Sequence, residues 1–349
     1  MLGYLSKRIA WGAVLFLAIT LVVYVLFFII PVDPTRRGRG TTAEELYIRE
    51  AYSIEGPIWE EYPRFVWGVV RHGDLGNSYG NRQEVSEIIR RAAPVTISLV
   101  VGAAFFWLLI AIPVGTISAL RPRSVLDRAS MLFVLVGISL HPLWMGLVFS
   151  YFAGYRWGIA PIGGYCNLLD NDVSQRCAGL IPWAHHLLLP WFTLSLLFAA
   201  LYTRMVRASV LDTMQDDYVR TAIAKGASSW RVVRSHVLRN ALLPIVTMLA
   251  MDLGVALGMS FFVEIAFGLP GLGSESVRAL RRRDLPVIVG VTTVGAIAVV
   301  TLTTIVDIVY GLLDPRVRRA HRYRGDEQRE PELAAAETAS APAFARASR

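Results

Sequence analysis

The side chains able to do chemistry are few in this sequence, and most of them stand alone. Asp252 is an isolated carboxylate inside a long apolar run. A charge at the centre of a bilayer helix costs about 2.5–3.5 kcal/mol, so we expect Asp252 to face the interior of a helix bundle or a water-filled cavity. It either lines a path, where it contacts a charged group of a solute, or is hydrogen-bonded between helices. Both alternatives stay open at this stage.

Two cysteines and three histidines are the remaining candidates. Cys166 and Cys177 either form a disulfide, which would clip a loop outside the cytoplasm, or stay as two free thiols. His185 and His186 fit polar residues at a membrane interface, and His72 fits a loop. These residue types show no metal-ligand spacing, so we expect no metal and no cofactor.

The sequence also lacks a site for nucleotide. A phosphate-binding loop places Lys directly after Gly in Gly-x-x-x-x-Gly-Lys-Ser/Thr, but Lys7 follows Leu-Ser and Lys225 precedes Gly226. Catalytic His, Asp or Ser residues do not cluster at one depth in facing apolar runs, as a membrane-embedded enzyme would need. We therefore expect no catalytic residue, and any ATP hydrolysis must reside on a partner.

The elements that position these residues are apolar helices. Hydrophobic residues make up 54% of the 349 residues, and the mean hydropathy is +0.47. A bilayer core needs about 20 apolar residues per helix. Six runs meet that length: 9–30, 95–120, 129–155, about 183–203, 241–263 and about 285–313. The sequence predicts an all-α integral membrane protein with six transmembrane helices.

Positive charge sets the expected orientation and domain limits. The net charge of the chain is +8. The Arg residues flank the apolar runs instead of forming one stripe, and this pattern favours contact with membrane lipid over contact with nucleic acid. The rule that cytoplasmic connections are positive places both termini in the cytoplasm. We expect an N-terminal helix (1–31), an extracytoplasmic segment (32–93), a five-helix core (94–319) and a disordered cytoplasmic tail (320–349).

One cytoplasmic segment predicts a helical elbow. A short helix ends near Lys225, and Gly226 permits the left-handed backbone that a tight turn between helices needs. Ala222 and Ala224 would let another protein approach closely, while Arg220 and Lys225 would make polar contacts. The alternative is an ordinary amphipathic connector that lies on anionic lipid.

The elbow resembles the "EAA" segment of bacterial ABC importer permeases, in which small residues and a glycine precede Leu-Pro by about 17 residues. Here these are Ala222, Ala224, Gly226 and Leu243-Pro244, while Thr221 replaces the motif's Glu. Further segments are similar to the dipeptide, oligopeptide, nickel and glutathione importer permeases: 73–78, 137–146, 262–273, 283–286 and 307–316.

The resemblance implies the type I importer architecture, with a coupling helix at about 217–230 that docks on an ATPase subunit. The implied coupling residues are Asp217, Tyr218, Arg220, Thr221, Ala222, Ala224, Lys225 and Gly226. For the translocation path the candidates are Ser139, Trp144, Asp252 and Met259.

Implied partners are a second homologous permease, two ATP-binding cassette subunits and an extracytoplasmic substrate-binding protein, at a bacterial inner membrane. Peptides are the expected substrate class. The alternative is a secondary transporter driven by an ion gradient, which should show internal repeats that we do not find.

Overall fold

In the computed structural model, the described part of the chain is almost entirely helical. The described residues are 2–29, 58–78, 80, 82–167, 177, 179–282 and 284–313. The helices are α1 (Leu2–Ile29), α3 (Ile58–His72), α4 (Val85–Leu120), α5 (Val125–Ser139), α6 (Pro142–Phe149), η2 (Ser150–Arg156), α7 (Leu180–Thr213), α8 (Asp217–Ala224), α9 (Ser229–Val232), η3 (Val233–Val237), α10 (Leu238–Ala241), α11 (Leu243–Phe267), α12 (Leu272–Arg282) and α13 (Leu285–Leu313). The predicted tail and the first part of the segment 32–93 lie outside these residues.

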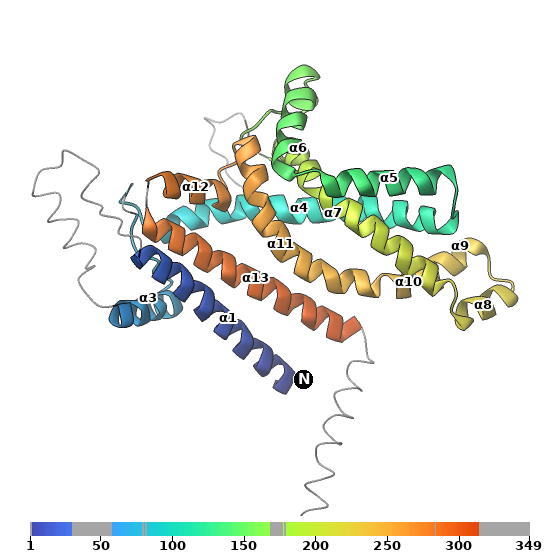
Figure 1. The fold of residues 1–349 in the computed structure, drawn as a ribbon, viewed down its shortest axis with the longest axis horizontal. Helices are drawn as coiled ribbons and strands as arrows, with labels where there is room; N and C mark the ends of the chain where they lie inside the picture. The colour runs from blue at the N-terminus through green and yellow to red at the C-terminus, as the bar shows by residue number, and fades with distance from the viewer. Residues whose placement is uncertain are drawn as a thin grey trace, which may run out of the picture.

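The core lies where α4 packs along α7 (Figure 1). Trp107 of α4 is buried against two aromatic rings of α7, Phe198 at 4.6 Å and Tyr202 at 5.9 Å between ring centroids. Gly115 lets the two backbones come close, because a Cβ there would lie only 2.8 Å from the carbonyl oxygen of Thr203. Apolar, closely packed helices of this kind are expected of a membrane bundle.

Different short helices lie at the two ends of the long helices. Figure 1 shows α8 and α9 at one end, and α3 and α12 at the other. The helix α13 packs against both α1 and α11, and α12 contacts α4, α11 and α13. The segment that contains the predicted elbow is therefore far from the segment that precedes the last long helix.

The predicted third span is not one straight helix. The helix α5 ends at Ser139, Leu140 is extended, and Pro142 begins α6, so the two stretches meet at 105°. Proline disfavours helical backbone in the residue before it, which explains the break at His141. The Nδ1 atom of His141 accepts a hydrogen bond from the backbone N–H of Leu143 and caps the new helix.

Among the described residues, α4 and α7 are long and apolar enough to cross a membrane. The bent pair α5 with α6 and η2, and the two halves of α11, which meet at 42°, raise the number of candidate spans to four. Shorter apolar stretches occupy Ala10–Val25 within α1 and Pro286–Leu302 within α13.

Candidate functional site

The elbow is a short helix closed by a complete helix-ending motif. The chain leaves α7 and enters α8, which ends at Ala224. Gly226 has a φ of +79°, its N–H donates to the carbonyl of Ile223 at 2.9 Å, and the N–H of Ala227 donates to the carbonyl of Ala222 at 3.2 Å. This pair of bonds defines the Schellman motif, in which a left-handed residue satisfies the last carbonyls of a helix. The predicted left-handed turn at Gly226 is confirmed.

The inner face of the elbow attaches it to the bundle. Val219 is only 1% exposed and belongs to the main apolar core. Asn240 of α10 donates a hydrogen bond to the hydroxyl of Tyr218 at 2.7 Å, and Ser209 of α7 donates to the carbonyl of Ala241 at 2.7 Å. The first bond joins the elbow to the helices that lead into α11, and the second joins those helices to α7.

The outer face of the elbow combines charged rim residues with exposed apolar side chains. Ile223 is 57% exposed and Trp230 is 70% exposed. Arg220, Thr221, Ala224, Lys225 and Gly226 are also exposed. The weak pair of Arg220 and Asp217, 4.0 Å apart, leaves both side chains in solvent. Apolar groups within a charged rim are typical of a protein-docking surface.

The two alanines of the elbow have different surroundings. Ala224 is exposed, as the close-approach hypothesis requires, but Ala222 is half-buried and packs against the chain's own core. The sequence predicts that both allow another protein to approach closely. The difference follows from helix geometry, because Ala222 lies three residues after the buried Val219 and so shares its face.

An ion pair joins the start of α5 to α7, with Asp127 buried and Arg207 half-buried. Arg207 of α7 donates to both carboxylate oxygens of Asp127, at 2.7 and 3.0 Å. Asp127 also accepts hydrogen bonds from the hydroxyl of Ser118 and the backbone N–H of Arg123. Sequence reasoning missed this pair. The spacing of Ser124 and Asp127 was a signal, because the Ser124 hydroxyl caps α5 at the N–H of Asp127.

Asp252 is hydrogen-bonded between helices but is not fully buried. The hydroxyl of Tyr202, on α7, donates to one carboxylate oxygen of Asp252, on α11, at 2.7 Å. Tyr202 is completely buried, whereas Asp252 is half-buried. The structure thus supplies the hydrogen-bonded alternative and still leaves part of the residue accessible.

The other path candidates lie on three helices. Ser139 ends α5 exposed, with its hydroxyl bonded to the carbonyl of Leu135. Trp144 is exposed on α6, and Met259 is half-buried on α11 against the core. The helices α6 and α11 are in contact, and a Cβ on Gly146 would lie 2.7 Å from the side chain of Ala266. None of the hydrogen bonds described in the structure links these three residues to Asp252.

The end of the bundle opposite the elbow contains a buried carboxylate. Glu264 is fully buried near the end of α11. Its carboxylate accepts hydrogen bonds from the hydroxyl of Thr96, at 2.6 Å, and from the backbone N–H of Ser274, at 3.0 Å. The hydroxyl of Thr96 in turn accepts from the N–H of Leu272, at 2.9 Å. A carboxylate at the start of α12 satisfies N–H groups that a helix leaves without partners.

Two glycines of this segment lie where a side chain would not fit. A Cβ on Gly271 would lie 2.4 Å from Glu264, and one on Gly273 would lie 2.7 Å from the backbone of Phe261. The family resemblance marked this segment, but the role of Glu264 in it was missed.

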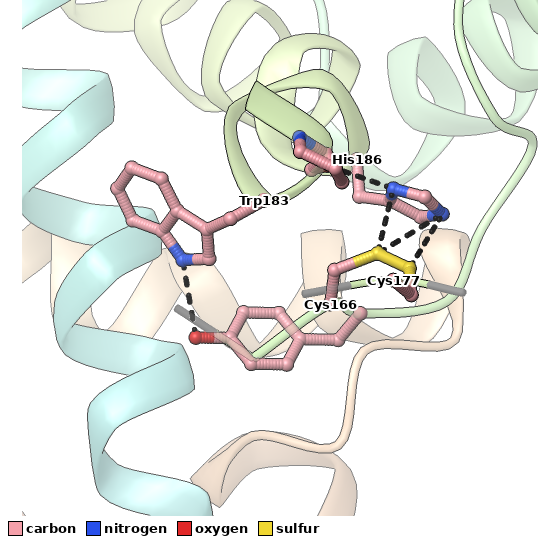
Figure 2. The surroundings of a disulfide bond; sticks show 6 residues. Cys166, Cys177, Trp183 and His186 are labelled. Carbon is pink, nitrogen blue, oxygen red and sulfur yellow. Dashed lines mark hydrogen bonds between the residues drawn. A yellow bond between two sulfur atoms is a disulfide. The ribbon is translucent and has the colours of Figure 1, made fainter. Parts of the chain in front are cut away.

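A disulfide joins Cys166 and Cys177 beside the start of α7 (Figure 2). His186 lies against it: the Nε2 atom is 3.6 Å from the sulfur of Cys166 and 4.0 Å from that of Cys177. These three residues offer ligand atoms within 4.8 Å of one another, a cluster that the sequence does not predict. The expectation that no metal binds stays a prediction. Sequence spacing missed the cluster because the ligands come from a loop and from a helix.

Two family models match the chain. Residues 111–319 match the binding-protein-dependent transport system inner membrane component, and residues 1–100 match the N-terminal region of membrane components of such transport systems. The dipeptide transport system permease protein DppB of Escherichia coli K12 is 31% identical over 337 residues, and the oligopeptide transport system permease protein AppB of Bacillus subtilis 168 is 33% identical over 322 residues. Each match covers 91% of this chain and 99% of the relative.

The fold is also similar to that of a solved structure. A chain of the MetNI methionine ABC transporter, in inward facing conformations, matches with a TM-score of 0.52 and 19% sequence identity. The match covers 65% of this chain and 97% of that chain.

Proposed function

This chain belongs to the family of binding-protein-dependent transport system inner membrane components, and from that premise we propose how it works as a permease subunit of an ATP-driven peptide importer. Its relatives are permeases for dipeptides and oligopeptides, which favours peptides as the substrate class. The same membership favours the importer over a secondary transporter driven by an ion gradient. ATP hydrolysis belongs to separate subunits, and this chain supplies half of the path.

We infer six transmembrane spans with both termini in the cytoplasm. The four candidate spans, including the two bent ones, and the apolar stretches in α1 and α13 support this number. In this topology α8 and α9 face the cytoplasm and α12 faces the outside, in agreement with their positions at opposite ends of the bundle (Figure 1). The chain would lie in a bacterial inner membrane.

The observation that carries the coupling proposal is the exposed elbow between α7 and α11. Its turn is held by its own backbone hydrogen bonds, and Val219 anchors it in the core, so a push on the elbow reaches both long helices. Ile223 and Trp230 provide apolar contacts for an ATPase subunit, with Arg220 and Lys225 at the rim. The elbow needs no catalytic group, because it only transmits movement between two states.

The proposed assembly contains this chain, a second homologous permease, two ATP-binding cassette subunits and a substrate-binding protein. The binding protein delivers the peptide from outside. Closure of the ATPase subunits on ATP then moves the coupling helices and switches access to the path. Asp252, held at one oxygen by Tyr202, presents its accessible part to the path, where it attracts the amine of a peptide.

Reconstitution tests this function. Proteoliposomes that contain the permease pair and its ATPase subunits, supplied with the binding protein and a labelled dipeptide, should accumulate peptide only when ATP reaches the ATPase side. Uptake that continues without the ATPase subunits and follows an imposed ion gradient would contradict the proposal.

A further inference from the structure

We propose that Cys166, Cys177 and His186 form a binding site for a soft divalent metal ion, with Zn²⁺ as the type, when their disulfide is reduced. This site is separate from the path and from the elbow. In the oxidised chain the same two cysteines form the disulfide of Figure 2.

The positions of the three residues fit a zinc site. In a tetrahedral centre with Zn–S of about 2.3 Å and Zn–N of about 2.0 Å, nitrogen and sulfur ligands lie about 3.5 Å apart. The Nε2 atom of His186 is already 3.6 Å from the sulfur of Cys166 and 4.0 Å from the sulfur of Cys177. Reduction releases the two sulfurs from each other. The imidazole must also turn, because the sulfur of Cys166 is 3.1 Å from Nδ1 and 3.6 Å from Nε2, and the lone pair of Nε2 does not yet point at it.

The hydrogen bond of the His186 ring selects the tautomer that a metal on Nε2 requires. Its Nδ1–H donates to the carbonyl oxygen of Pro182 at 2.9 Å and also lies 3.1 Å from the sulfur of Cys166. Donation from Nδ1 leaves the lone pair on Nε2, the atom that lies within 4.0 Å of both sulfurs. Metal-binding histidines usually donate their second ring N–H to a carbonyl in this way.

The surrounding structure positions Cys166 and His186. Before Cys166, the N–H of Gly164 donates to the carbonyl of Phe267 at 3.1 Å. Trp183, one turn before His186, donates to the hydroxyl of Tyr165 at 3.2 Å (Figure 2). Cys166 is buried, whereas Cys177 and His186 are half-buried, so a fourth ligand such as water can approach from one side.

The change between the two states is a thiol–disulfide exchange with an external dithiol. One thiolate of the dithiol attacks the more exposed sulfur, that of Cys177, and Cys166 leaves as a thiolate. The second thiol displaces Cys177 and closes the reagent's own disulfide. Two electrons have then passed to the protein, which holds two thiols, and Zn²⁺ binding releases their two protons.

Cobalt binding to the full chain tests the site. The purified protein in detergent is reduced with dithiothreitol, freed of reagent without oxygen and titrated with Co²⁺ alone. We expect one Co²⁺ per chain, a thiolate-to-cobalt charge-transfer band, and loss of the band on addition of Zn²⁺. Unreduced protein should show no band. Reduced protein without a band would overturn the proposal.

Two adjacent histidines provide matched variants. His186→Ala should weaken Zn²⁺ binding at least about tenfold, since loss of even an outer partner of a metal ligand costs about 10–100-fold. His185→Ala should bind as the wild type does, because the Nε2 of His185 is engaged by the carbonyl of Ile159 at 3.0 Å. Equal affinity in both variants would contradict a role for His186.

A measurement on the unaltered chain avoids any folding defect of a variant. Reduced protein should react with two equivalents of iodoacetamide, and one equivalent of Zn²⁺ should slow both reactions. Alkylation of both thiols at an unchanged rate would overturn the proposal.

Discussion

The two ends of the bundle satisfy their polar groups in opposite ways. At the elbow the charged side chains remain in solvent, and the turn at Gly226 is closed by local backbone bonds. At the α12 end, Glu264 is fully buried and is held by Thr96 and Ser274, which belong to other segments. The first end leaves its surface free for a partner, whereas the second depends on long-range contacts within the chain. Changes at the two ends should therefore have different effects.

The largest loss of stability is expected from Glu264→Ala. It leaves the N–H of Ser274 and the hydroxyl of Thr96 buried without their acceptor, which costs about 3 kcal/mol. The apparent Tm of the purified chain in detergent should fall clearly. Glu87→Ala, which removes an exposed carboxylate paired with Arg91, is the control and should change stability by less than about 0.5 kcal/mol. A similar Tm for the two variants would show that the buried carboxylate contributes no more to stability than an exposed one.

Two Arg–Asp pairs allow a second comparison. Arg207→Ala leaves the carboxylate of Asp127 buried without its cation. We expect a loss of about 2 kcal/mol, below the about 3–5 kcal/mol of a fully buried pair because Arg207 is half-buried. Arg220→Ala breaks the exposed pair with Asp217 and should leave stability unchanged. Thermal unfolding of the two variants measures both. If Arg220→Ala proved as destabilising as Arg207→Ala, the elbow would not be the solvent-facing surface described above.

Gly226→Ala should cost about 1 kcal/mol, because the left-handed backbone disfavours a Cβ although no atom obstructs it. This loss of stability is small, but ATP-driven uptake should fall strongly. The reason is that the substitution changes the angle at which α8 meets α9. Gly258→Ala is the matched control, because its Cβ also meets no atom and its φ is not positive. Normal uptake by the Gly226→Ala permease would show that coupling does not depend on this turn.

A stability effect as small as that of Gly226→Ala is expected at Tyr202. Tyr202→Phe removes one hydrogen bond to Asp252 and should cost about 1 kcal/mol.

Asp252→Asn tests the path itself: uptake of cationic peptides should fall more than uptake of neutral ones. Unchanged uptake of both classes would exclude Asp252 from the path and leave it as a contact between helices.

The sequence predicted those features that depend on neighbours along the chain. Apolar run length located the long helices, and the position of Gly226 predicted the left-handed turn. The bend at Pro142 was also encoded locally, but the uninterrupted apolar run concealed it. The number of spans stays a prediction, as do the coupling and path roles.

Features that depend on packing could not be predicted in the same way. Asp127 meets Arg207 across 80 residues, and Thr96 meets Glu264 across 168. Such partners are set by which helices touch, and no spacing rule connects them. Ala222 illustrates the same limit on a small scale, because its burial depends on the core beneath α8 and not on its residue type.

The central claim is that the elbow contacts an ATPase subunit, and site-specific cross-linking tests it most directly. Both native cysteines are paired, so Ala224→Cys places the only free thiol of the chain on the exposed elbow. Gln83→Cys places it on an exposed position at the opposite end. In membranes with the co-expressed ATP-binding subunits, a thiol-anchored cross-linker at position 224 should capture a protein with a P-loop, and position 83 should not. Capture from position 83, or none from 224 in a complex that still transports, would contradict the account.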